Sequence, residues 1–134
     1  TDIASHSTSN PTSISQYAAV AALTGSYKPI NEMKKAFEER RDYVVKRIRA
    51  MPTLECKNPL GAFYVYVNIQ KALEGKGYEN CAQWVEKLLE EKRVAVIPGS
   101  AFGSAQFIRI SYATSLDQLK LALDRIEQFI YSHV

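Results

Sequence analysis

Hydrophobic residues in the first third of the chain recur at helical spacing. Residues 11–24 are rich in alanine and keep apolar side chains three or four positions apart, with Asn10 as the expected N-cap and Gly25 as the stop. A second helix of about 20 residues is expected to open at Pro29 and to end at Pro52, because one apolar stripe continues through a strongly charged sequence. The stripe consists of Met33, Phe37, Val44, Ile48 and Met51.

An alternation of period two, rich in β-branched and aromatic residues, predicts the clearest strand over residues 62–69. This period assigns one wholly apolar face to the core, made of Phe63, Val65, Val67 and Ile69. A polar loop around Gly75 and Gly77 is expected to follow. It would lead to a helix over residues 81–91, in which Cys81, Val85, Leu88 and Leu89 face inward.

Two further strands and a final helix complete the predicted elements. A short buried strand is expected at residues 94–97 and another at 106–112, separated by a loop over residues 100–104. Ser115 is placed to cap the last helix, where leucine and isoleucine recur at spacings of three and four. The last two strands are linked by only about nine residues, so they should be antiparallel, since a parallel crossover needs more chain.

The predicted fold is therefore of the α/β class, in its α+β form. It is a two-layer sandwich in which a small, mainly antiparallel sheet of three strands lies against long flanking helices. The 134 residues can bury one core. We expect the chain to be a fragment of something longer, because the opening segment is polar, aperiodic and lacks an initiator Met.

Charge and cysteine content exclude several classes of function. The net charge of +3 comes from basic and acidic residues interleaved along helices, which is typical of a solvated surface and not of a nucleic-acid site. No apolar run approaches the ~20 residues that span a bilayer, so no membrane segment is expected. Cys56 and Cys81 lack metal-ligand spacing, so we expect no metal site. They lie in unrelated segments, so we favour two free thiols in a reducing cytoplasm over a structural disulfide.

Arg109 is the residue whose position most directly suggests chemistry. It lies in the middle of a predicted strand between Ile108 and Ile110, on the face shared by Phe107 and Ser111. A guanidinium in such a place needs a partner, and its planar fork suits a carboxylate or phosphate. The pattern leaves open whether that partner is a ligand or an Asp or Glu of the same domain.

Four stretches, in order, resemble the C-terminal third of class I aminotransferases that use pyridoxal phosphate, with the bacterial type of aspartate aminotransferase the most similar. They are Ser9-Asn10-Pro11 with Ser15-Gln16, then Pro59-Leu60-Gly61-Ala62-Phe63-Tyr64, Val96-Ile97-Pro98-Gly99-Ser100-Ala101-Phe102-Gly103, and Ile108-Arg109-Ile110-Ser111-Tyr112-Ala113. Any one of the four would be weak evidence. Their common order across well over half of the chain makes the resemblance specific. It implies that residues 1–10 continue from a large domain that is missing here and that residues 11–134 form a small C-terminal domain.

The resemblance implies a role for individual residues. Arg109 matches the arginine that binds the α-carboxylate of the amino-acid and 2-oxo-acid substrates, and Phe63 matches an aromatic residue near the substrate. Ser9 and Asn10 match a segment near the dimer interface and the partner's active site, although helix capping would also explain them. Some aspartate-specific relatives have an arginine near the position of Ser5, so its absence leaves acidic-substrate preference undecided.

The family's catalytic lysine, the aspartate on the cofactor ring and the phosphate-binding residues belong to the large domain, and none of their motifs occurs here. The isolated chain is thus expected to hold no catalytic residue, to bind no pyridoxal phosphate and to be inactive. In the parent, we expect a homodimer, contacts with the large domain, and transfer of an amino group between an amino acid, with aspartate favoured, and a 2-oxo acid. The alternatives are the same domain of a related lyase or decarboxylase, and a non-catalytic α/β binding module.

Overall fold

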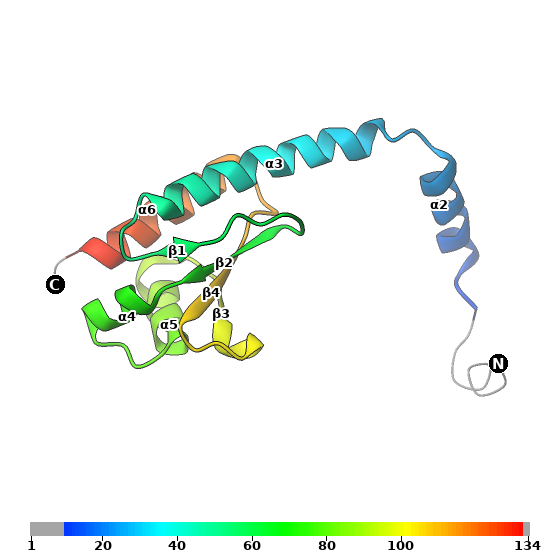
Figure 1. Cartoon of the computed structure of the whole chain (residues 1–134). Coiled ribbons are helices and arrows are strands. Elements are labelled where there is room, and N and C mark those ends of the chain that lie inside the picture. The colour runs from blue at the N-terminus through cyan, green and yellow to red at the C-terminus, as the bar shows by residue number, and fades with distance from the viewer. Residues whose placement is uncertain (1–9, 133–134) are drawn as a thin grey trace. The chain divides into compact units, whose positions relative to one another are not determined.

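The computed structural model describes residues 10–132 of the chain, which divides into two compact units, Thr1–Met33 and Lys34–Val134. Helix α2 (Ser13–Thr24) lies in the first unit, and the long helix α3 (Lys28–Arg49) begins in the first unit and continues into the second (Figure 1). All strands and the remaining helices belong to the second unit. The predicted boundary between residues 10 and 11 remains a prediction.

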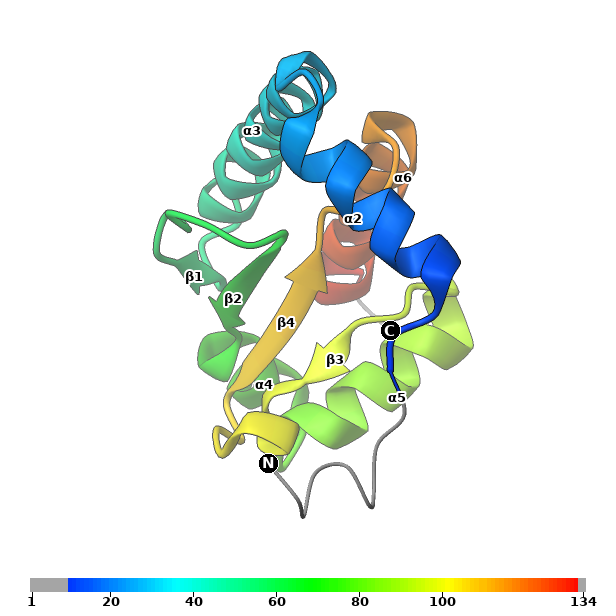
Figure 2. The same cartoon turned by 90° about the vertical axis from the view of Figure 1, so that its right-hand side faces the viewer.

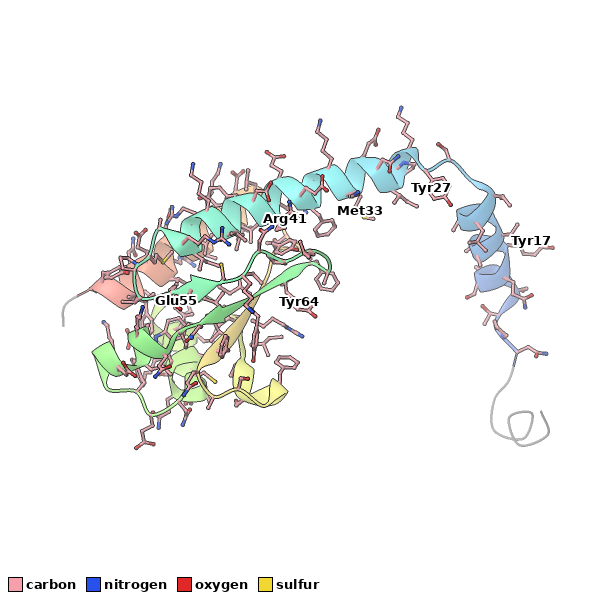
Figure 3. The ribbon with its side chains drawn as sticks, viewed as in Figure 1. Tyr17, Tyr27, Met33, Arg41, Glu55 and Tyr64 are labelled. Atoms are coloured by element: carbon pink, nitrogen blue, oxygen red, sulfur yellow. The ribbon has the colours of Figure 1, made fainter. Side chains whose placement is uncertain are left out.

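Helix α2 is amphipathic only weakly and leaves its apolar side chains exposed. It ends at Gly25 as expected, but its N-cap is Thr12 and not Asn10, because the Thr12 side chain accepts a hydrogen bond from the Ser15 amide at 3.4 Å. No residue of α2 is buried. Figure 3 shows Tyr17 projecting away from the helix, and the exposed fractions of Ile14, Tyr17, Val20 and Leu23 are 81%, 78%, 58% and 83%.

The sheet is antiparallel, as predicted, but has four strands in place of three. They are β1 (Glu55–Cys56), β2 (Tyr64–Asn68), β3 (Ile97–Pro98) and β4 (Phe107–Ser111), arranged in the order β1-β2-β4-β3 (Figure 2). Strand β1 is too short to show a period of two, and the sequence therefore did not reveal it. Strand β3 begins later than the predicted range of 94–97, because only Ile97 and Pro98 pair with β4.

Three further helices and a short 3-10 turn connect and cover the strands: α4 (Gln70–Lys76), α5 (Cys81–Lys92), η1 (Gly99–Phe102) and α6 (Leu116–Tyr131). The prediction of a polar loop around Gly75 is wrong. Residues 70–76 form helix α4, which buries Ala72 and Leu73 and ends at a left-handed cap at Gly77. Ser115 caps α6 as predicted, its side chain accepting from the Gln118 amide.

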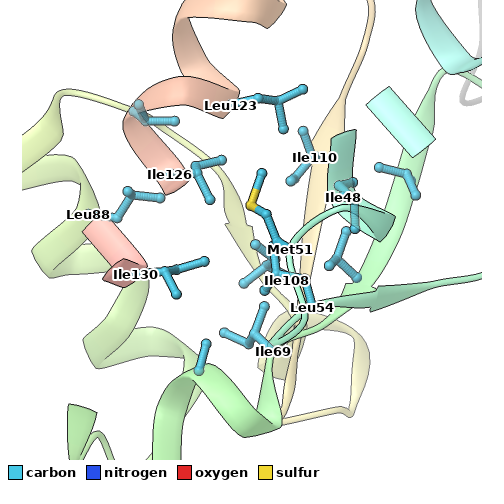
Figure 4. Packing of buried hydrophobic residues seen from close by; sticks show 14 of the residues in the cluster. Ile48, Met51, Leu54, Ile69, Leu88, Ile108, Ile110, Leu123, Ile126 and Ile130 are labelled. Carbon is cyan, nitrogen blue, oxygen red and sulfur yellow. The ribbon is translucent and has the colours of Figure 1, made fainter. Parts of the chain in front are cut away.

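The core lies between one face of the sheet and helices α3, α5 and α6, which confirms the two-layer sandwich (Figure 4). On the sheet, Val65, Val67, Ile108 and Ile110 face this core. Leu89 was expected to point inward but is 47% exposed, because Trp84 and Leu88 fill the inward side of α5. The members of the core that Figure 4 labels are Ile48, Met51, Leu54, Ile69, Leu88, Ile108, Ile110, Leu123, Ile126 and Ile130.

An ionic contact also joins two of the covering helices. The Arg47 guanidinium of α3 lies 2.8 Å from carboxylate oxygens of both Asp124 and Glu127 on α6. Partial burial works against this charge, but the hydrogen bond to Asp124 and the nearby acidic groups leave the pKa of Arg47 raised. Helices α3, α5 and α6 thus cover one face of the sheet, on which the core lies. The side chains that alternate with the core residues along each strand point to the opposite, outer face.

Candidate functional site

Arg109 lies in the middle of that outer face. Its neighbours Ile108 and Ile110 are buried on the core side, and the arginine pairs with Tyr66 of β2 on one side and Ile97 of β3 on the other. The sequence prediction that Arg109 shares a face with Phe107 and Ser111 is confirmed by the strand pairing. The side chain is partly exposed, so ligands can reach it from the outer side of the sheet.

Among the residues that the structure describes, aromatic rings and no carboxylates contact the guanidinium of Arg109. Its central carbon lies 4.9 Å from the centroid of the Tyr64 ring and 4.5 Å from that of Phe102. Among residues 10–132, Arg109 makes no salt bridge. A cation over ring faces still has its in-plane N–H groups available, and these are the donors that bind a carboxylate in a fork.

These two rings belong to a larger aromatic group, which we call the aromatic face: Phe63, Tyr64, Tyr66, Phe102 and Phe107. Phe63 meets Tyr64 edge to face at 6.0 Å, and Phe102 meets Tyr66 in the same way at 6.5 Å. Tyr66 stacks on Phe107 at 4.8 Å with an angle of 8° between the ring planes. Each ring of the aromatic face therefore touches another, and such contacts restrict side-chain motion.

The structure moves Phe63 from its predicted place in the core to the edge of the aromatic face. Strand β2 starts only at Tyr64, and the Phe63 side chain is 52% exposed. The cause is Ala62, whose φ of 62° is left-handed, so the alternation expected from residue 62 onward begins two residues later. Tyr112 fixes this turn, because its hydroxyl donates to the Ala62 carbonyl oxygen at 3.1 Å and its amide donates to that of Phe63 at 2.8 Å.

Turn η1 carries Phe102 to the guanidinium, and it can form only because residue 99 is glycine. A Cβ on Gly99 would lie 2.5 Å from the carbonyl oxygens of Phe107 and Ser104 and 2.7 Å from the Tyr66 hydroxyl. The Gly99 carbonyl oxygen accepts from the Ser104 amide at 3.0 Å and from the Tyr66 hydroxyl at 3.4 Å. The sequence predicted a plain loop here, so the contribution of Phe102 to the site was missed.

A groove of about 490 Å³ lies beside the aromatic face and shares two of its residues, Tyr66 and Phe107. The rest of its lining is mostly polar and comprises Glu55, Cys56, Lys57, Asn68 and Ser104. Burial raises the pKa of the Cys56 thiol, although nearby Arg49 opposes this, so the thiol stays protonated at neutral pH. Cys56 and Cys81 are both free, as expected.

The two remaining candidate positions receive little support from the structure. Ser9 lies outside the described residues. Asn10 is exposed and precedes α2 without capping it. Over the range 10–132, no group of three or more metal-ligating side chains is close enough to hold an ion, and no helix is both long and apolar enough to cross a membrane.

Comparison with known proteins identifies the family of the chain. Residues 1–126 match the family model described as aminotransferase class I and II. The chain is 47% identical over 133 residues to an aspartate aminotransferase of Bacillus subtilis, covering 99% of this chain and 34% of that protein. It is 41% identical over 128 residues to an asparagine–oxo-acid transaminase of Streptococcus mutans, covering 96% and 33%.

Solved structures give the same result. The fold superimposes on an aspartate aminotransferase from Rhizobium meliloti with a TM-score of 0.88 and 43% identity, over 96% of this chain and 33% of that one. For an aspartate aminotransferase from Thermotoga maritima the TM-score is 0.83 at 40% identity, over 96% and 31%. The chain spans about a third of the length of these relatives. It belongs to the class I and II aminotransferase family.

Proposed function

We propose that this chain is the part of a longer aminotransferase that binds the substrate carboxylate. The parent would move an amino group between an amino acid and a 2-oxo acid. The observation that carries the proposal is the guanidinium of Arg109, which lies on an outer sheet face against two rings with no acidic partner among the described residues. A charged group in this position is best satisfied by an anionic ligand.

The family implies pyridoxal phosphate as cofactor, but the residues of this chain do not fit a covalent site for it. The cofactor's aldehyde reacts with a neutral lysine amine, which a protein obtains by burial or by a neighbouring cation. None of the lysines described here is buried, and hydrogen bonds to Glu55 and Glu90 raise the pKa of Lys71 and Lys87. We therefore assign the cofactor to other residues of the parent and expect the isolated chain to bind none and to be inactive.

The contribution of this chain would be to hold and orient the substrate. A forked pair of N–H bonds from Arg109 fixes both oxygens of the α-carboxylate, and this limits rotation of the bond to the reacting carbon. The rings of Tyr64 and Phe102 keep water away from the faces of the guanidinium, which strengthens the ionic contact. Phe63 is half exposed at the edge of the aromatic face, and we expect it to lie near the substrate.

Aspartate is the amino acid that we propose as substrate, since aspartate aminotransferases recur among the most similar relatives. We also propose a homodimeric parent in the cytoplasm. The exposed apolar side chains of α2 support a contact with the large domain or a second subunit, and two free cysteines fit a reducing compartment.

The substitution Arg109→Lys in the full-length protein tests the proposal. Lysine keeps the charge and loses the fork, so we expect a loss of about 2 to 4 kcal/mol, or tens- to about a thousand-fold in kcat/KM for aspartate and for the 2-oxo acid together. Arg125→Lys, on α6, changes another partly exposed arginine and should have no such effect. Unchanged kcat/KM in Arg109→Lys would refute the substrate role.

A further inference from the structure

We propose that Tyr64 and Phe102 are positioning residues, which together clamp the guanidinium of Arg109 and hold it ready for a carboxylate. The carboxylate role of Arg109 rests on the function proposed above. The clamp itself rests on the two cation–ring contacts, at 4.9 Å and 4.5 Å.

An arginine with no fixed partner would sample many rotamers, and a ligand would lose affinity by ordering it. In proteins that problem is often solved by a neighbouring carboxylate, but such a partner would occupy the N–H donors that the substrate needs. Ring faces attract the cation without using those donors. An aromatic clamp therefore orders the guanidinium and leaves its fork available.

The clamp comes from two separate elements, so it holds the side chain from more than one direction. Tyr64 lies on β2, diagonally across the ladder from Arg109, since its direct partner is Ser111. Phe102 is the last residue of η1, which returns over the outer face after β3. Arg109 itself lies on β4.

Phe102 is in turn braced by Tyr66, the direct cross-strand partner of Arg109. The ring of Tyr66 is stacked on Phe107, and its hydroxyl donates to the carbonyl oxygen of Gly99, the first residue of η1. The position of Phe102 thus depends on both a ring contact and a hydrogen bond to its own turn.

The test is a double-mutant cycle on the full-length protein, with 2-oxoglutarate binding measured by titration calorimetry. Phe102→Leu keeps an apolar side chain and removes the ring, so the dissociation constant should rise about 2- to 10-fold, the range of a partly exposed cation–ring contact. Phe102→Tyr restores a ring and should restore affinity. In the Arg109→Leu background, which has no cation for the ring to hold, Phe102→Leu should have no further effect. Tyr131→Leu, a partly exposed aromatic residue on α6, is the matched control.

Each other outcome would overturn the clamp. Equal losses for Phe102→Leu in the two backgrounds would show that Phe102 acts independently of Arg109, and no loss in either would show that it does not act. If Arg109→Lys itself leaves binding unchanged, the substrate role fails, and the clamp is then judged by modification of Arg109 with phenylglyoxal, mapped by mass spectrometry on the unliganded protein. The rate at which phenylglyoxal modifies Arg109 should rise about twofold or more in Phe102→Leu, since the rings shield the cation. An unchanged rate would exclude the clamp.

Discussion

Gly99→Ala should lower the stability of the domain and weaken the carboxylate site that we propose at Arg109. The added Cβ would meet two backbone oxygens at 2.5 Å, those of Phe107 and Ser104, and the Tyr66 hydroxyl at 2.7 Å. Backbone oxygens cannot rotate away, and the Ser104 amide is itself bonded to the Gly99 carbonyl. Turn η1 must therefore shift away from β4.

Introducing one methyl group into a space that is already filled costs about 1 to 3 kcal/mol when neighbours can adjust. Here two of the three neighbours belong to the backbone, so we expect a cost near 3 kcal/mol. The same shift would carry Phe102 off the guanidinium of Arg109. Binding of a 2-oxo acid should consequently weaken in any molecules that remain folded.

Urea unfolding of the 134-residue chain provides the assay, with the fluorescence of Trp84 as the reporter, because it is the single tryptophan and is fully buried. Gly75→Ala is the matched control. A Cβ there meets nothing within 4 Å, and Gly75 lies inside α4, where alanine should stabilise the helix by about 0.5 to 1 kcal/mol. If the two variants have equal unfolding free energies, the argument from close approach at Gly99 is wrong.

Two further predictions concern the turn before β2. Ala62→Gly should raise the unfolding free energy by about 0.5 kcal/mol. Glycine removes the strain of a left-handed alanine, and this gain exceeds the cost of the extra conformational entropy that glycine gives the unfolded chain. A lower unfolding free energy in urea would contradict this. Tyr112→Phe removes the hydroxyl bonded to the Ala62 carbonyl and should cost about 1 kcal/mol at neutral pH. Burial raises the pKa of Tyr112 above its ordinary 10.0, with Arg41 opposing, so this contribution is complete below that pH and is lost as pH rises through the folded-state pKa. The wild-type chain should therefore lose more stability above about pH 10 than Tyr112→Phe does, and equal losses would rule out this assignment.

Elements with a long, uninterrupted hydrophobic period could be predicted from the sequence, and those governed by single backbone conformations could not. Helix α6 repeats its apolar spacing over four turns and has a serine cap, so its start and its inward leucine and isoleucine residues were predictable, whereas the buried Phe129 was not anticipated. Helix α4 was missed because Gly75 and Gly77 are typical of loops, whereas the structure uses one inside the helix and the other as its left-handed cap.

The same distinction explains the prediction for Phe63. A strict period of two placed it in the core, but the period holds only while the backbone stays extended. The left-handed conformation of Ala62 interrupts it, and it is maintained by a hydrogen bond from Tyr112, fifty positions away along the chain. Local patterns contain no information about such a distant contact, so the exposed position of Phe63 could be learned only from the structure.

Arg109 was identifiable from sequence, but its surroundings were not. Between Ile108 and Ile110, the alternation of the strand is enough to place a charged side chain opposite the core. Which groups meet it there depends on strand pairing and on the course of η1. The side chains that share its face on β2 and β4 are Tyr64, Tyr66, Asn68, Phe107 and Ser111, so these two strands supply one cation and no counter-charge. The acidic residue on this face of the sheet, Glu55 of β1, lies opposite Asn68 and forms an ion pair with Lys71 at 2.6 Å. An anion bound beside Tyr64 and Phe102 would therefore meet Arg109 as the charged group of β2 and β4, and its orientation would depend on the rings that hold the guanidinium.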